Sequence, residues 1–143
     1  MKYLANNCIS AKYIPMSESI SKQIKYQILR VAIPAAGAIV NINANTDKLY
    51  KKITGILVTV PYLVTFLNRS TLNLLINDKE IFPDDFEVKL ITCDSYVPTN
   101  ERFYLMDDVA DGSTVKGKFK DGADAGAVYP YTVNIYLKLE ERV

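Results

Sequence analysis

The segment Tyr131–Leu139 constrains the fold of this chain more than any other stretch. It places an apolar side chain at every odd position and a polar or amphipathic one at every even position. Side chains alternate between the two faces of a β-strand, so this period of two indicates a strand with one face on a core. We therefore expect Thr132, Asn134, Tyr136 and Lys138 to face outward and the odd-numbered side chains to be buried.

Short strand-like segments recur along the rest of the chain, with turn-forming residues between them. The residues Asn77, Asp78 and Lys79 are typical of a tight hairpin, and the pairs Asp111-Gly112 and Asp121-Gly122 are typical of turns. No long helical pattern interrupts this series. We predict an all-β fold, an antiparallel β-sandwich of about eight strands that is jelly-roll-like. The candidate strands cover residues 24–33, 38–42, 53–60, 63–67, 71–76, 80–82, 86–90, 103–106, 115–119 and 131–139.

The first of these segments can be interpreted in two ways. A helix beginning near Ser17 would place Ile20, Ile24 and Ile28 on one face. The β-branched and aromatic residues that dominate after Lys25 favour a strand instead. In that strand the apolar side changes after Ile28, which predicts a β-bulge there.

A length of 143 residues fits one domain with a real core. We expect residues 1–20, which lack periodicity, to form an irregular N-terminal arm, and residues 21–143 to form a single β-sandwich domain. The most apolar run, residues 53–67, has fifteen residues. That is shorter than the ~18–20 residues of a membrane helix, so we expect no membrane span.

The chain lacks the side chains that most catalytic sites need. It has no histidine, so a serine or cysteine nucleophile cannot be activated by one, and no metal can be held by one. Gly112–Lys118 has the spacing of a phosphate-binding loop, but Phe119 follows it where a hydroxyl residue and a helix are needed. Cys8 and Cys93 are expected to be free thiols. We predict a protein that is not an enzyme and holds no cofactor, and leave a calcium site on the loop aspartates open.

The net charge of +1 conceals an uneven distribution. Residues 1–76 carry nine Lys/Arg against two acids, a net +7, whereas residues 77–143 carry eight against fourteen, a net −6. These charges can be satisfied within one fold, or by association of the basic part of one copy with the acidic part of the next. The N-terminal basic residues are dispersed rather than clustered, which disfavours nucleic acid as a partner.

Ten tyrosines make the chain rich in a residue that suits contact surfaces. The candidate interaction residues fall into two groups. Tyr3 and Tyr13 would anchor the N-terminal arm on a neighbour. The other group would form a subunit contact or a sugar-stacking platform, and consists of Tyr104, Tyr129, Tyr131 and Tyr136.

The stretches Leu72–Pro83 and Tyr129–Leu137, on a strand-rich body of this size, resemble small structural proteins of bacteriophage particles. The resemblance implies a minor capsid protein of the penton or decoration type that assembles as a homo-oligomer. Its partners would be other virion structural proteins, contacted through edge strands, loops and the arm. The location would be the virion, assembled in the host cytoplasm. The alternative is a carbohydrate-binding or adhesion sandwich that uses exposed tyrosines.

Overall fold

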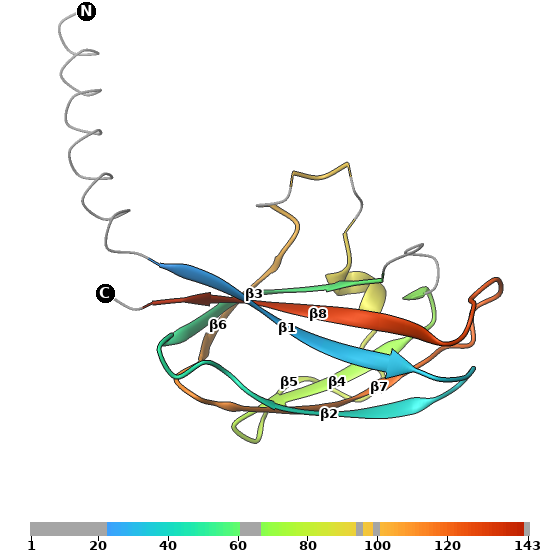
Figure 1. The fold of residues 1–143 in the computed structure, drawn as a ribbon, viewed down its shortest axis with the longest axis horizontal. Helices are drawn as coiled ribbons and strands as arrows, with labels where there is room; N and C mark the ends of the chain where they lie inside the picture. Colours follow the sequence, from blue (N-terminus) through green and yellow to red (C-terminus); the bar gives the residue numbers. More distant parts are fainter. Residues whose placement is uncertain (1–22, 61–66, 94–95, 99–100, 142–143) are drawn as a thin grey trace, which may run out of the picture.

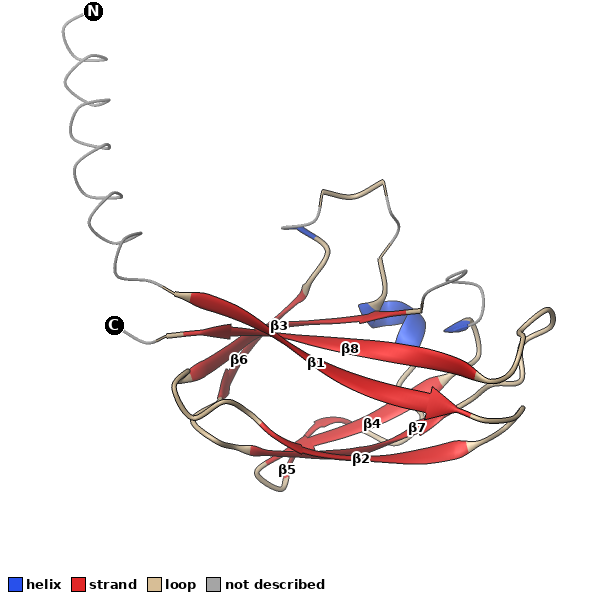
Figure 2. Cartoon of the chain, in the orientation of Figure 1, coloured by secondary structure: helices blue, strands red, loops and turns tan. Residues whose placement is uncertain are grey.

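The computed structural model describes residues 23–60, 67–93, 96–98 and 101–141, and these form two antiparallel sheets of four strands each (Figures 1 and 2). The predicted antiparallel β-sandwich is confirmed. The strands are β1 (Ile24–Ile33), β2 (Ile39–Asn45), β3 (Lys52–Thr59), β4 (Thr71–Ile76), β5 (Lys79–Phe82), β6 (Tyr104–Val109), β7 (Thr114–Lys120) and β8 (Tyr131–Glu140).

The first sheet has the strand order β1-β8-β3-β6. Its central strand β8 pairs with β1 over the whole length of both strands, from Ile24 opposite Glu140 to Ile33 opposite Tyr131. Every odd residue of β8 is buried and every even one is half-buried, as its alternating sequence predicts. The apolar strand β3 lies between β8 and β6, the central position expected for a strand that is apolar on both faces.

The second sheet has the order β2-β7-β4-β5. Two of the turns that flank its strands use residues that tolerate positive φ. Asn77 and Asp78 have φ values of 51° and 65° and join β4 to β5, as predicted for a tight hairpin. Asp111 and Gly112, with φ values of 51° and 77°, form the turn between β6 and β7.

The strand pairs are nested along the sequence. The first strand pairs with the last, β2 with β7, β3 with β6, and β4 with β5, and all four pairs are antiparallel. Successive strands therefore alternate between the two sheets until β4, and do so again after β5. This winding places β1 and β2 at one side of the sandwich, where they pack against each other, and makes β6 and β5 the other outer strands.

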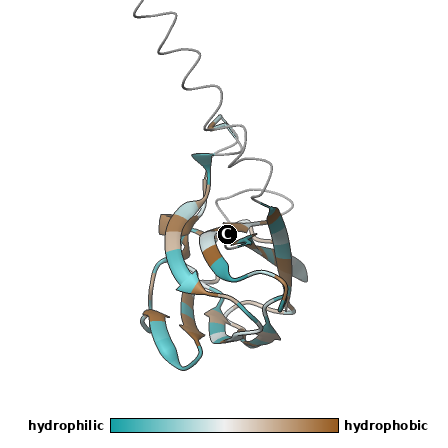
Figure 3. Cartoon of the chain, turned by 90° about the vertical axis from the view of Figure 1, so that its left-hand side faces the viewer, coloured by the Kyte–Doolittle hydropathy of each residue, from teal (hydrophilic) through white to brown (hydrophobic). Residues whose placement is uncertain are grey.

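The core lies between the two sheets and consists mainly of aliphatic side chains, together with the rings of Phe82, Phe119 and Tyr131. The alternating colour bands along the strands in Figure 3 reflect this division into inner and outer side chains. The largest fully buried side chains include Phe119, Ile33, Ile53, Ile56, Leu67, Leu72, Leu74, Ile91, Ile135, Leu137 and Leu139.

Two expectations for individual strands are wrong. Residues 86–90 do not form a strand, because Val88–Ile91 is a short 3-10 helix that buries Val88 and Ile91. The bulge expected after Ile28 is also absent, since the β1–β8 register is continuous. The apolar residues Ile24 and Tyr26 instead lie on the outer face of the sheet, with exposed fractions of 46% and 49%.

Some predictions concern residues outside the described part of the chain. These are the N-terminal arm with Tyr3 and Tyr13, Cys8, and most of the segment 63–67. Cys93 is a free, half-buried cysteine. No helix in the described ranges has the length and apolar character needed to cross a bilayer.

Candidate functional site

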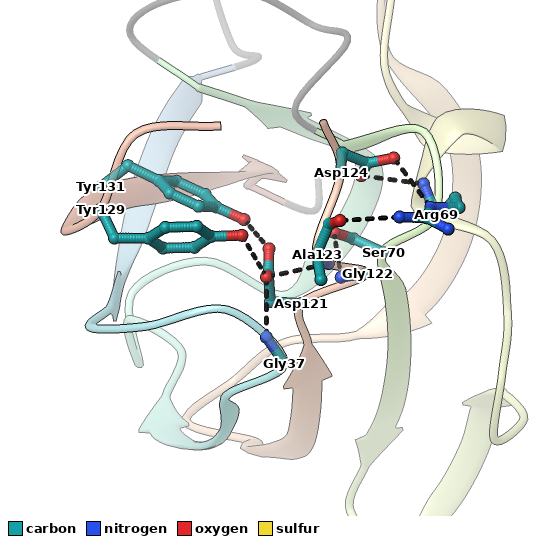
Figure 4. Close-up of polar contacts among 9 residues, drawn as sticks. All are labelled: Gly37, Arg69, Ser70, Asp121, Gly122, Ala123, Asp124, Tyr129 and Tyr131. Carbon is teal, nitrogen blue, oxygen red and sulfur yellow. Dashed lines mark hydrogen bonds and ion pairs between the residues drawn. The ribbon is translucent and has the colours of Figure 1, made fainter. Parts of the chain in front are cut away.

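A buried carboxylate organises the end of the sandwich where β7 ends and β8 begins (Figure 4). Asp121 directly follows β7 and is only 2% exposed. It accepts hydrogen bonds from the hydroxyls of Tyr129, at 2.6 Å, and Tyr131. It also accepts from the backbone N–H groups of Gly37 and Ala123, each at 3.0 Å.

These four donors determine how the cluster ionises. Burial alone would raise the pKa of Asp121, but the hydrogen bonds outweigh it and hold that pKa below its ordinary 3.8. The hydrogen bond to this carboxylate raises the pKa of Tyr129 to about 12. Burial, followed by the same carboxylate, raises the pKa of Tyr131. Asp121 is therefore a charged acceptor whose oxygens are already occupied, and it stabilises structure rather than offering a free reactive group.

A neighbouring contact ties the same loop to the segment before β4. The carboxylate of Asp124 accepts from the backbone N–H of Arg69 at 3.1 Å and from its Nε at 3.4 Å. The guanidinium also donates to the carbonyl of Ala123 at 2.7 Å, and Gly122 N–H donates to Ser70 Oγ at 3.2 Å. The loop after β7 is thus held at several points.

The structure distributes the four candidate tyrosines over three places. Tyr129 and Tyr131 lie together at Asp121, with ring centroids 5.4 Å apart, but Tyr131 is only 3% exposed. Tyr136 lies on the outer side of β8. Tyr104 is at the β6 edge, with its ring centroid 5.9 Å from that of Phe82. The four rings do not form one continuous platform.

The outer side of the first sheet carries an apolar surface, which we call the apolar face. It consists of Ile24, Tyr26 and Ile28 on β1, Tyr136 on β8, Leu57 on β3, and Phe103. Ile28, Tyr136 and Leu57 form one row across three strands because they are direct cross-strand partners.

Phe103 reaches the apolar face because Gly55 leaves room for it. A Cβ atom at Gly55 would lie 3.0 Å from the Cβ of Phe103, so a larger residue there would force the ring to shift. The Phe103 ring packs at a centroid distance of 5.4 Å from Tyr26. A hollow of about 370 Å³ opens beside them, with Thr59 and Arg102 also in its wall.

The side of the sandwich formed by β1 and β2 is held by polar contacts at one end. Lys25 and Asp47 form an ion pair of 2.6 Å, and Gln27 bonds both to the carbonyl of Asn45 and to the N–H of Asp47. A groove of about 370 Å³ runs between residues 28–32 and 40–44. Within the described ranges each of these strands pairs on one side only, so backbone groups of both remain available at this edge.

A hollow of about 640 Å³ near the β4–β5 hairpin is lined by lysines and aspartates. Each lysine in its wall is paired with one aspartate, at distances of 2.7 to 3.3 Å. Each charge in its wall therefore has an opposite partner. A catalytic pair of acids would instead consist of two carboxyl groups with different protonation states. The pairs are Lys51–Asp111, Lys52–Asp107 and Lys79–Asp108.

Ion pairs inside the fold partly compensate the uneven charge of the two halves of the sequence. The ion pairs Lys51–Asp111, Lys52–Asp107 and Arg69–Asp124 each join a residue of 1–76 to one of 77–143. This supports the interpretation that the halves complement each other within one copy. The part of the chain that the structure describes contains no group of three or more acidic or cysteine side chains placed to hold a metal ion.

The segment with phosphate-loop spacing runs into a strand, because β7 spans Thr114–Lys120 and no helix follows it in the described chain. A nucleotide site of that kind needs a helix N-terminus at the phosphates. No known protein family, curated protein or solved structure matches the chain.

Sequence reasoning missed the arrangement around Asp121. Its partners lie up to 84 positions away, and an Asp-Gly pair normally signals only a turn. The apolar face was visible as Ile24, Tyr26 and Ile28 alternating, but this pattern was attributed to a bulge rather than to an outer surface.

Proposed function

We propose that this protein is a non-enzymatic structural subunit of a virus particle, which self-associates and docks on other virion proteins. The apolar face carries the proposal, because it combines three exposed apolar side chains on the outermost strand β1 with aromatic rings on its neighbours. Apolar surface gathered on one face of a stable scaffold marks a site of protein contact. The free edges of β1 and β2, together with residues 1–20, would extend that contact.

We also propose that the sandwich is a jelly roll. The nested pairs β1·β8, β2·β7, β3·β6 and β4·β5, with strand orders β1-β8-β3-β6 and β2-β7-β4-β5, support this. They are what results when one long antiparallel hairpin is wound into two sheets. A jelly roll is a fold of capsid proteins, although fold alone does not decide function.

The test is incorporation into particles in the host cytoplasm. Mass spectrometry of purified particles should detect the chain at a fixed ratio to the major capsid protein. The double variant Tyr26→Asp, Ile28→Asp should still fold but should be absent from particles. The control is Leu49→Asp, which places the same charge at an isolated, 76% exposed leucine and should be incorporated normally. Absence of the unmodified chain from particles would contradict the proposal.

A second candidate, a carbohydrate-binding sandwich, is favoured by the hollow on the apolar face. Its wall includes the rings of Tyr26, Phe103 and Tyr136, which have the apolar faces on which sugars stack. A glycan array distinguishes the two candidates. Sugar binding that is lost in Tyr136→Ala would favour the second, whereas Tyr131→Ala is uninformative because that ring is buried.

A further inference from the structure

The outer face of the second sheet carries a row of lysines. Lys116, Lys118 and Lys120 alternate along β7 and are all exposed. None has an ion-pair partner within 4 Å among the residues that the structure describes. Successive members are two residues apart, about 7 Å along the strand, so their charges repel one another. We call this row the lysine column.

A row of acids lies on the same face, beyond β4. Glu80 is the cross-strand partner of Leu75, and Glu87 that of Thr71. Asp84 and Asp85 lie between them in the chain, and line a hollow of about 260 Å³ that also includes Lys118 and Lys120. Within the described ranges only Glu87 has an ion pair, at 3.5 Å to Lys89. We call Glu80, Asp84, Asp85 and Glu87 the acidic column.

The two columns are in register across β4. Leu75 has Lys116 on one side and Glu80 on the other. Thr71 has Lys120 on one side and Glu87 on the other. Lys116 and Lys120 on one side, and Glu80 and Glu87 on the other, are direct cross-strand partners of β4, so both pairs lie about 4.8 Å from it.

This arrangement is self-complementary. Consider a twofold axis that runs along β4 in the plane of contact. A rotation of a second copy by 180° about this axis exchanges the two sides of β4 and leaves positions along β4 unchanged. Lys116 of one copy then faces Glu80 of the other, and Lys120 faces Glu87. Leu75 and Asn73 meet their own equivalents on the axis.

We propose that this face is a twofold contact between two copies of the chain, in which the lysine column of each meets the acidic column of the other. The inference rests on the proposed function, for which it names one partner surface. A contact in which the same surface serves both partners closes as a dimer. It differs from the head-to-tail association considered from sequence, because both columns lie within residues 77–143.

The size of the face limits the strength of the contact. Four strands about 4.8 Å apart and four to seven residues long offer roughly 400 Å² of flat surface per copy. That is about half of the ~800 Å² per partner of a standard specific interface, so the contact should be weak, sensitive to salt, and effective mainly where other contacts add to it. A particle made of many copies provides this condition.

Charge reversal tests the inference on the full chain. One variant carries Lys116→Glu and Lys120→Glu, and the other Glu80→Lys and Glu87→Lys. All four positions are exposed strand or bridge residues, and circular dichroism checks that both variants fold. In sedimentation experiments at low salt, each variant alone should dimerise at least about 100-fold more weakly than the unmodified chain. An equimolar mixture should regain dimers, because every facing pair is then of opposite charge.

The control mixture combines Lys48→Glu with Glu101→Lys, which reverses exposed charges away from this face. It should behave as the unmodified chain does. The inference is overturned if the unmodified chain does not dimerise, if either reversed variant dimerises as well as it does, or if the two variants do not combine. Dimers that survive both reversals but are lost in Tyr26→Asp, Ile28→Asp would overturn this contact and leave the proposed function standing. Absence of the chain from particles would instead contradict the proposed function.

Discussion

Removing the Asp121 carboxylate should destabilise the fold more than removing any surface charge. The substitution Asp121→Ala deprives four donors of their acceptor. The hydroxyl of Tyr131 is buried with it, and the loss of its carboxylate acceptor in this setting costs about 1–3 kcal/mol. The other three donors lie closer to solvent, where water replaces part of the lost interaction. We expect a total loss of about 3–4 kcal/mol in the free energy of unfolding.

Urea unfolding at neutral pH, followed by circular dichroism, measures this loss. The control is Asp107→Ala, because Asp107 pairs with Lys52 at 3.0 Å but its side chain is 76% exposed. Exposed pairs contribute about 0–1 kcal/mol, so the control should remain close to the unmodified protein. A loss below about 1 kcal/mol for Asp121→Ala, or equal losses for both variants, would refute the reasoning.

The same carboxylate predicts a pH dependence. The pKa of Asp121 in the folded protein lies below its ordinary 3.8. The stabilisation that this shift represents is therefore fully present above the pKa of the unfolded chain, and is lost as the pH falls through the folded value. The stability difference between the unmodified protein and Asp121→Asn should be constant above about pH 5 and should shrink below about pH 4. A difference that grows on acidification would contradict this assignment.

Three further predictions concern single positions. Gly117→Ala should unfold the protein or cost more than about 3 kcal/mol, because its Cβ would lie 2.0 Å from the carbonyl oxygen of Asn73; thermal unfolding close to that of the unmodified chain would contradict this. Ultraviolet titration should show a tyrosine ionisation at about pH 12. This ionisation should be absent from the titration curve of Tyr129→Phe, and an unchanged curve would refute the prediction. Arg69→Ala should cost no more than about 1 kcal/mol in urea unfolding, since the guanidinium is largely exposed, and a loss above about 2 kcal/mol would show a larger role.

The strands with one buried face were predictable because apolar and polar residues alternate along them, with the apolar ones facing the core. Tyr131–Glu140 shows this most clearly, and the Asn77-Asp78 turn follows from its tolerance of positive φ. Two features were misread. The apolar residues Ile24, Tyr26 and Ile28 were assigned to a bulge, because the sequence does not say that an outer face is apolar as well. Val88–Ile91 has β-compatible residues, but it follows Pro83 and the Asp85 turn with positive φ and continues as a 3-10 helix.

The candidate surfaces were predictable only in part. The lysine column is visible in the sequence as lysines at 116, 118 and 120. Its relation to Glu80 and Glu87 depends on the registers of β4 with its two neighbours, and the pairing of β4 with β7 joins segments that are far apart in the sequence. The Asp121 cluster likewise joins the turn at Gly37 to Tyr131, and a contact between such distant segments cannot be predicted from a local sequence pattern.

The central claim is that this sandwich acts through its outer surfaces by binding copies of itself and other particle proteins. Sedimentation equilibrium of the full chain from about 1 µM to about 1 mM tests it most directly. We expect the average mass of the unmodified chain to rise reversibly with concentration. Variants of the surface that makes the contact should have a lower average mass at the same concentration. A monomer mass across the whole range, identical in every variant, would contradict the account.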